Sequence, residues 1–162
     1  LERLYIIEEI KSTNLKLRSK YTVRTTTKKI FVDPSIATAT LEITPTDLVN
    51  DLNTFGFMFE SLCLRDLEIY SQSYGGNLTY YRDENDFEID AILKLSNGKW
   101  GAIEIKLGSG YIDEAAKNLL KLKEKISKNS IQPSFLMVLT GANYSYRRED
   151  GVYVVSIGTL KD

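Results

Sequence analysis

The chain has 162 residues, of which 43% are hydrophobic and 27% charged, and its net charge is -1. This length and composition predict one soluble domain with its own core, and no run approaches the roughly 20 apolar residues of a membrane span. With no signal peptide in the sequence, we expect a cytoplasmic protein that has no membrane partner. One cysteine and no histidine exclude an internal disulfide, the usual zinc sites and Ser-His-Asp catalysis. Any chemistry must use carboxylates, lysines or tyrosines.

The N-terminal part predicts two strands joined by a basic loop. Residues 3–10 and 28–43 are rich in β-branched and aromatic residues, and the second run is interrupted by Asp33-Pro34, so it predicts a strand that leads into a turn. Residues 11–29 predict a loop in which cationic residues either solubilise the surface, the reading we favour, or follow a nucleic-acid strand. These residues are Arg24, Lys28 and Lys29. Because the chain begins with leucine and not with methionine, we expect it to be a piece of a longer protein.

A long helix is predicted next, beginning at the N-cap Thr46, broken near Asn53 and ended by a pair of glycines. Its apolar residues recur at the spacing that keeps one helical face buried. They are Leu52, Phe55, Phe59, Leu62 and Ile69. The following runs at residues 78–83, 87–95 and 99–107 predict three strands of an antiparallel meander.

A second amphipathic helix is predicted over residues 111–128, followed by closing strands at 133–141 and 151–160. The helix should bury Ile112, Ala115, Leu119, Leu122 and Ile126, and should expose Lys117, Lys121 and Lys125. The order of strands and helices predicts an α/β fold with a mixed central sheet flanked by helices.

The turn between the second and third meander strands decides which side chains share a face. A two-residue loop, Asn97-Gly98, would place Asp90 and Glu104 on opposite faces of the sheet. A three-residue loop that also includes Ser96, with the glycine left-handed, would place these carboxylates directly opposite each other. We favour the three-residue loop because it also assembles a continuous apolar face on the strand pair.

Two carboxylates opposite each other on neighbouring strands, with Cβ atoms about 5 Å apart, repel each other unless a cation lies between them. A divalent metal, Mg²⁺ or Mn²⁺, fits that position because it binds carboxylate oxygens together with waters and phosphate. Asp90 and Glu104 are the candidate ligands, with the Ile105 carbonyl as a third. Lys106 lies on the same face as Glu104 and would orient a water or stabilise charge on a phosphate.

The sequence "EID", then 13 residues, then "EIK" resembles the PD-(D/E)xK nuclease superfamily. Glu60, in "FGFMFESLCLRDL", matches the helical glutamate that many members use to complete the metal site. The proline that usually precedes the motif aspartate is replaced by Ile89. The resemblance is strongest to the C-terminal domain of unknown function of prokaryotic AAA-type ATPases, and it covers roughly residues 29–162.

This resemblance implies a restriction-endonuclease-like fold, catalytic residues Asp90, Glu104 and Lys106, and a metal site completed by Ile105 and Glu60. It also implies an ATPase module N-terminal to this domain, with residues 1–28 as a linker or the end of the preceding segment, packed on the domain at 29–162. The ATPase module would lie outside these 162 residues, because they contain no Gly-rich Walker A motif. The expected function is Mg²⁺-dependent hydrolysis of DNA or RNA. The alternative is a non-catalytic module that binds a partner or nucleic acid for the ATPase.

Each candidate residue also has a purely structural interpretation. The trio at positions 90, 104 and 106 would be a solvated salt-bridge patch, although Ile92 and Ala102 on the same face suggest cover by the long helix. Candidate nucleic-acid contacts lie on the second helix and in the loop before the last strand. They are Lys117, Lys121, Arg147 and Arg148, and their structural interpretation is a solvated helix face and a polar hairpin loop.

Overall fold

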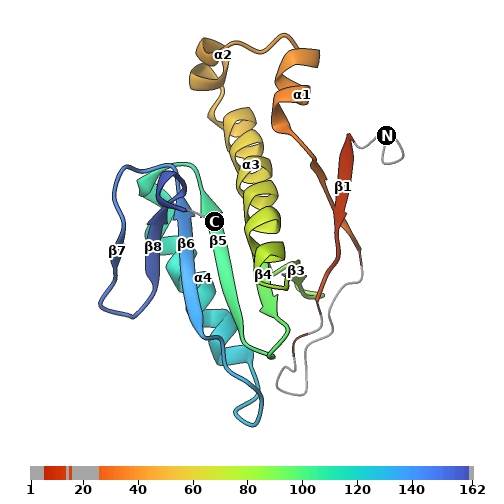
Figure 1. Ribbon diagram of the computed structural model, residues 1–162. Helices are drawn as coiled ribbons and strands as arrows, with labels where there is room; N and C mark the ends of the chain where they lie inside the picture. Colours follow the sequence, from red (N-terminus) through yellow and green to blue (C-terminus); the bar gives the residue numbers. More distant parts are fainter. Residues whose placement is uncertain (1–5, 14, 16–25, 161–162) are drawn as a thin grey trace.

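A computed structural model describes residues 6–13, 15 and 26–160 of the chain. It confirms the predicted α/β class, because a six-stranded mixed sheet is flanked by helices (Figure 1). The strands are β1 (Ile7–Ile10), β2 (Lys28–Phe31), β3 (Gly76–Arg82), β4 (Glu88–Leu95), β5 (Trp100–Lys106), β6 (Phe135–Thr140), β7 (Tyr146–Arg147) and β8 (Tyr153–Ser156). The helices are α1 (Pro34–Thr40), α2 (Pro45–Asn50), α3 (Leu52–Ser73) and α4 (Ile112–Lys125).

The main sheet has the strand order β3-β4-β5-β6-β8-β7. β3, β4 and β5 pair antiparallel, which confirms the predicted meander. β6 is parallel to β5 and reaches it through α4, and β8 is parallel to β6. The prediction of a polar hairpin loop between the last two core strands was wrong, because these strands are parallel. The segment between them contains β7, which pairs antiparallel with β8. With two residues, β7 is too short to show the alternation of apolar and polar residues by which a strand is predicted from sequence.

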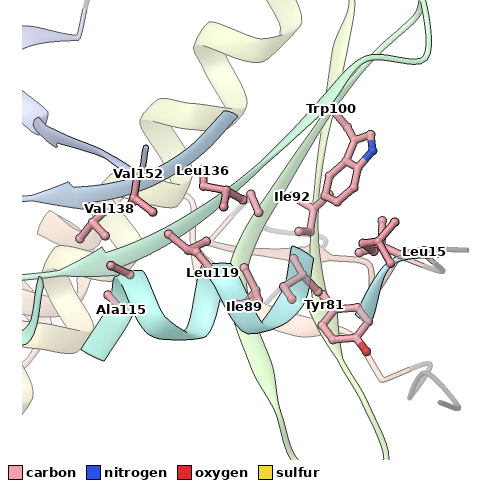
Figure 2. Packing of buried hydrophobic residues seen from close by; sticks show 14 of the residues in the cluster. Leu15, Tyr81, Ile89, Ile92, Trp100, Ala115, Leu119, Leu136, Val138 and Val152 are labelled. Carbon is pink, nitrogen blue, oxygen red and sulfur yellow. The ribbon is translucent and has the colours of Figure 1, made fainter. Parts of the chain in front are cut away.

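The sheet separates two hydrophobic clusters, one packed under α3 and the other under α4. Figure 2 shows the α4 cluster, in which Ile92 lies near Leu119 and Trp100. Ala102 belongs to the same cluster. The expectation that the long helix covers Ile92 and Ala102 was therefore wrong, because α4 covers them.

The long helical region is two helices, with the break at Asp51, close to the predicted one. The N-cap of α2 is Thr44, not Thr46, because its side chain forms a capping box with Asp47. The predicted buried face of α3 was partly wrong. Leu52 and Ile69 are exposed, and the buried residues are Phe59, Ser61, Cys63, Leu64, Leu67 and Ser71.

A helix follows the second strand at the place where the sequence predicted a turn. Asp33 caps α1 by accepting a hydrogen bond from the Ser35 amide, and Pro34 occupies the first helical turn. The sequence Asp-Pro is therefore a helix start here, which the β-branched residues of this stretch concealed.

The predicted apolar face of α4 is confirmed, since all five residues are buried. The predicted exposure of Lys125 was wrong. Its ammonium forms a buried ion pair with Asp83 and lies 4.4 Å from the centre of the Phe87 ring. Lys121 lies 4.7 Å from the same ring centre, while Lys117 is exposed.

The N-terminal segment joins β1 and β2 into a separate two-stranded antiparallel sheet. Beyond β1 the chain runs parallel to β3, with a bridge between Ser12 and Tyr80. Lys28 begins β2 and is not part of a loop as predicted. Arg24 lies outside the described residues.

The turn between β4 and β5 has the predicted three-residue form. Gly98 is left-handed, with φ of +80°, and its amide donates to the Leu95 carbonyl at 3.0 Å. The Leu95 amide donates to the Lys99 carbonyl at 2.8 Å. Ala91 then pairs with Ile103, as the three-residue register requires.

We predict that Gly98→Ala lowers the free energy of unfolding by about 1–2 kcal/mol, because a Cβ atom is unfavourable at this left-handed position. The matched control is Gly56→Ala, at an α3 position with open space around it. This control should raise stability by about 0.5–1 kcal/mol through helix propensity. Urea denaturation measures both changes, and equal effects of the two substitutions would contradict this turn.

Candidate functional site

The strand pair brings together the three predicted catalytic side chains. Lys106 Nζ lies 2.8 Å from Glu104 Oε2 and 3.5 Å from Asp90 Oδ2. Glu104 and Lys106 are two residues apart on β5, so their side chains leave the strand on the same side. The predicted convergence of Asp90, Glu104 and Lys106 is thus present in the structure.

A β-bulge in β4 helps to place Asp90. Thr79 pairs with Ile92, but Tyr81 pairs with Ile89, so that Tyr80 faces both Asp90 and Ala91. An extra residue of this kind redirects a side chain and weakens the local pairing. The Asp90 carboxylate accepts a hydrogen bond from the Ile105 amide at 2.8 Å, which fixes it beside β5.

A second lysine joins the site from β2. Lys28 Nζ lies 2.8 Å from Glu60 Oε1, 2.7 Å from Glu88 Oε1 and 3.9 Å from Asp90 Oδ1. Glu60 therefore reaches the site by way of Lys28. We call the whole group the carboxylate–lysine cluster. Its members are Lys28, Glu60, Glu88, Asp90, Glu104 and Lys106.

Burial gives the cluster unusual proton affinities. The pKa of Glu104 is raised to about 7, because burial disfavours the charged carboxylate and Asp90 repels it, while Lys106 acts in the opposite direction. Burial acts to lower the pKa values of Lys28 and Lys106, yet both pKa values are raised, because the neighbouring carboxylates stabilise the ammonium forms. Both lysines therefore stay protonated near neutral pH.

The raised pKa of Glu104 has a consequence for stability. Between pH 4.5, its ordinary pKa, and about 7, the folded chain holds the Glu104 proton more tightly than the unfolded chain does. Ionisation of this group therefore opposes folding as the pH rises through that range. A bound cation would relieve the cost, because it stabilises the ionised carboxylate.

A pocket of about 360 Å³ adjoins the cluster between β2 and α3. Lys28, Glu60 and Glu88 lie on its wall, and its remaining lining is largely apolar, including Phe31 and Phe57. The cluster is therefore approached from this side through a pocket that combines charged and apolar groups.

The other predicted nucleic-acid contacts lie in different surroundings. The Arg148 guanidinium is held by Asp113 at 2.5 Å and by Asp150 at 3.0 Å, and these contacts raise its pKa. The Arg147 guanidinium lies 5.4 Å from the centre of the Tyr153 ring. Within the described part of the chain, we find none of the predicted nucleic-acid residues paired with the carboxylates of the cluster.

Sequence reasoning missed Lys28 and Glu88 as members of this site. A signal for Lys28 exists: it is two residues from the buried Ile30, so the strand period places both on the same face of β2. The prediction of a loop at Lys28 does not use the strand period, so it does not place Lys28 on the same face as Ile30. Glu88 contacts Lys28 and, at 3.6 Å, Arg82.

The carboxylate oxygens of Asp90 and Glu104 are ligands suited to a hard cation. In this structure they form ion pairs with Lys106. Two carboxylates, one of them buried, converge on a single ammonium at Lys106, as they would on Mg²⁺. Among the described residues, no group of three acidic, cysteine or histidine side chains has the arrangement of a metal site. Metal binding would thus require Lys106 or Lys28 to move relative to the carboxylates.

The fold and this site define a mixed α/β domain with a buried, partly neutralised carboxylate cluster at a strand pair. Residues 55–160 match the family model described as "Domain of unknown function (DUF4143)", and the chain belongs to this family. The family is typically found at the C-terminus of AAA ATPases. Searches of curated proteins and of solved structures gave no match. The resemblance to PD-(D/E)xK nucleases stays a prediction.

A check for membrane spans among the described residues found no helix with the length and apolar character needed to cross a bilayer.

We predict that Lys28→Met lowers the free energy of unfolding by about 1–3 kcal/mol, because Glu60, Glu88 and Asp90 lose their shared cation. Lys29→Met is the matched control. The side chain of Lys29 is 67% exposed, against 19% for that of Lys28, and its ammonium forms an ion pair with Glu9 at 3.7 Å. The control should change stability by less than about 0.5 kcal/mol. Equal effects of the two changes in thermal or urea denaturation would contradict the buried role of Lys28.

Proposed function

We propose that this chain is the C-terminal domain of an AAA-type ATPase and that its carboxylate–lysine cluster is a site of Mg²⁺-dependent phosphodiester hydrolysis on DNA or RNA. The observation that carries the proposal is the convergence of Asp90, Glu104 and Lys106 at one strand pair. Membership of a family typical of ATPase C-termini supports the placement behind an ATPase module.

In this proposal Asp90 and Glu104 hold the metal, with the Ile105 carbonyl as a further ligand. When bound, Mg²⁺ or Mn²⁺ would acidify a coordinated water and neutralise charge on a phosphate. The Asp90 carboxylate is already positioned by the Ile105 amide, and the bulge of β4 keeps it beside β5. Glu60 contributes indirectly, by holding Lys28 at the edge of the pocket.

Lys106 acts as a hydrogen-bond donor in this reaction. Its raised pKa keeps the ammonium charged, so it would orient a water or stabilise charge on a phosphate but would not remove a proton. The exposed Lys117 and the nearby Lys121 on α4, with Arg147 and Arg148, are the proposed phosphate contacts. Arg148 would need to exchange its two carboxylate partners for phosphate.

The alternative is a non-catalytic module that binds a partner or nucleic acid for the ATPase. A specific observation favours it: Lys28 and Lys106 already supply two positive charges to the four carboxylates. In this case the cluster is a structural ion-pair network, and the metal site of the nuclease-like pattern has been replaced by lysine. The two functions differ in whether the native chain cleaves nucleic acid in the presence of a divalent cation that it binds.

The deciding experiment is calorimetric titration of the chain with Mg²⁺ and Mn²⁺, followed by cleavage assays on single- and double-stranded DNA and RNA. We predict that Asp90→Asn abolishes metal binding and lowers cleavage by at least about a hundredfold, since it removes a metal ligand. Glu84→Gln, which removes one negative charge at an exposed position, is the matched control and should leave both unchanged.

Absence of metal binding by the native chain would overturn the hydrolytic proposal and leave the non-catalytic module. Metal binding without cleavage of any of these nucleic acids would also exclude hydrolysis, while retaining a cation site at Asp90. Loss of activity in Glu84→Gln as well would show that general charge, not the cluster, controls the assay.

A further inference from the structure

Exposed apolar side chains are concentrated in one stretch of the described residues, which we call the helical platform: residues 41–57, formed by the C-cap of α1, all of α2 and the first turns of α3. Four of the eleven large hydrophobic side chains that are exposed among the described residues lie in this short stretch. They are Leu41, Val49, Leu52 and Phe57. Figure 1 shows α1 and α2 at one end of the molecule, away from the main sheet.

The α2 helix depends little on the core. It has no buried residue, and its N-terminus is held by the capping box between Thr44 and Asp47. A six-residue helix is marginal in water without tertiary packing. Val49 on this helix is exposed and does not pack into the hydrophobic core. Exposed apolar side chains of this kind are typical of surfaces that bind another molecule.

The charge of this region is one-sided. From residue 30 to residue 64 the sequence contains five acidic residues and no lysine or arginine. Glu42, Asp47 and Asp51 are exposed among the apolar side chains of the platform. Both aspartates are fixed by helix caps, so their negative charges are held in place on the surface.

The negative charges of the platform determine which class of partner can bind there. An anionic membrane and a nucleic acid would both be repelled by a surface that has carboxylates and no cation. A second copy of the chain docking by the same patch would bring like charges together. A basic partner is attracted, and an apolar stripe on that partner would cover the exposed side chains.

Phe57 connects the platform to a recess that can hold an anchor side chain. It is 72% exposed on α3, yet it also lines the pocket between β2 and α3 together with Met58 and Phe31. Amphipathic helices dock by placing apolar side chains at intervals of three or four residues into such grooves. A partner helix could therefore place one apolar side chain in the recess beside Phe57, whose wall also carries Lys28, Glu60 and Glu88.

We propose that the helical platform is a docking surface for a basic amphipathic helix of a partner protein. The surface is formed by Leu41, Val49, Leu52 and Phe57 and is bordered by Glu42, Asp47 and Asp51. This proposal does not depend on metal binding or hydrolysis at the carboxylate–lysine cluster, and its test requires no activity of the cluster.

The test uses the whole chain and two synthetic helical peptides of about 18 residues with the same leucine stripe. One peptide carries lysine at its polar positions and the other glutamate, and binding is followed by fluorescence anisotropy of the labelled peptide. We predict that the lysine peptide binds, that high salt weakens the binding, and that the glutamate peptide does not bind. Val49→Ser and Phe57→Ser should each weaken the lysine peptide by at least about tenfold.

Ile69→Ser is the matched control, because Ile69 is 56% exposed on the same helix but lies outside the platform. It should bind the lysine peptide like the native chain. Equal binding of both peptides, or unchanged binding by the Val49 and Phe57 variants, would overturn the proposal. A concentration-dependent dimer in ultracentrifugation that Val49→Ser dissociates would also overturn it, in favour of a second copy as the occupant.

Discussion

Carboxylates that face each other across two strands in a buried place repel each other, and a fold that contains them must supply positive charge. In this domain the three-residue turn at Gly98 sets the register, and the register brings Asp90 beside Glu104. Two lysines from separate elements pair with these carboxylates and offset their negative charge. They are Lys106 from β5 and Lys28 from β2. The position of the N-terminal strands therefore depends in part on the same electrostatic constraint as the candidate site.

Much of this arrangement could be predicted from the sequence because it depends on local rules. The strand period and the turn residues were sufficient for the meander and for the convergence of Asp90, Glu104 and Lys106. The helix α4 was equally accessible, because its apolar residues recur on one face. These features need no knowledge of distant residues.

The rest depended on contacts between distant parts of the chain. Lys28 is more than thirty residues from Glu60 and sixty from Glu88, so its role follows from tertiary packing alone. Asp33-Pro34 predicted a turn, but the side-chain cap of Asp33 and the proline start a helix there. Lys125 follows the spacing of an exposed lysine row, yet it is buried because Asp83 lies opposite it. In each case a distant or capping interaction overrides a local preference.

The molecule thus presents two regions with different physical character. The carboxylate–lysine cluster is half-buried around the buried Glu104, is partly neutralised by its own two lysines and lies where strands and α3 meet. The helical platform is exposed, acidic and apolar, and it lies away from the sheet. The proposed hydrolysis belongs to the first region and the proposed partner to the second, and the two regions meet at the pocket that Phe57 lines together with Lys28, Glu60 and Glu88.

The central claim is that Asp90 and Glu104 converge in a buried place. Its most direct test is the pKa of the Glu104 carboxyl, measured by carbon NMR over a pH titration in metal-free buffer, in the native chain and in Asp90→Asn. The structure predicts a pKa of about 7 for Glu104, because of burial and the repulsion by Asp90, and a lower pKa once that repulsion is removed. A Glu104 pKa near its ordinary 4.5, unchanged by the substitution, would contradict the account.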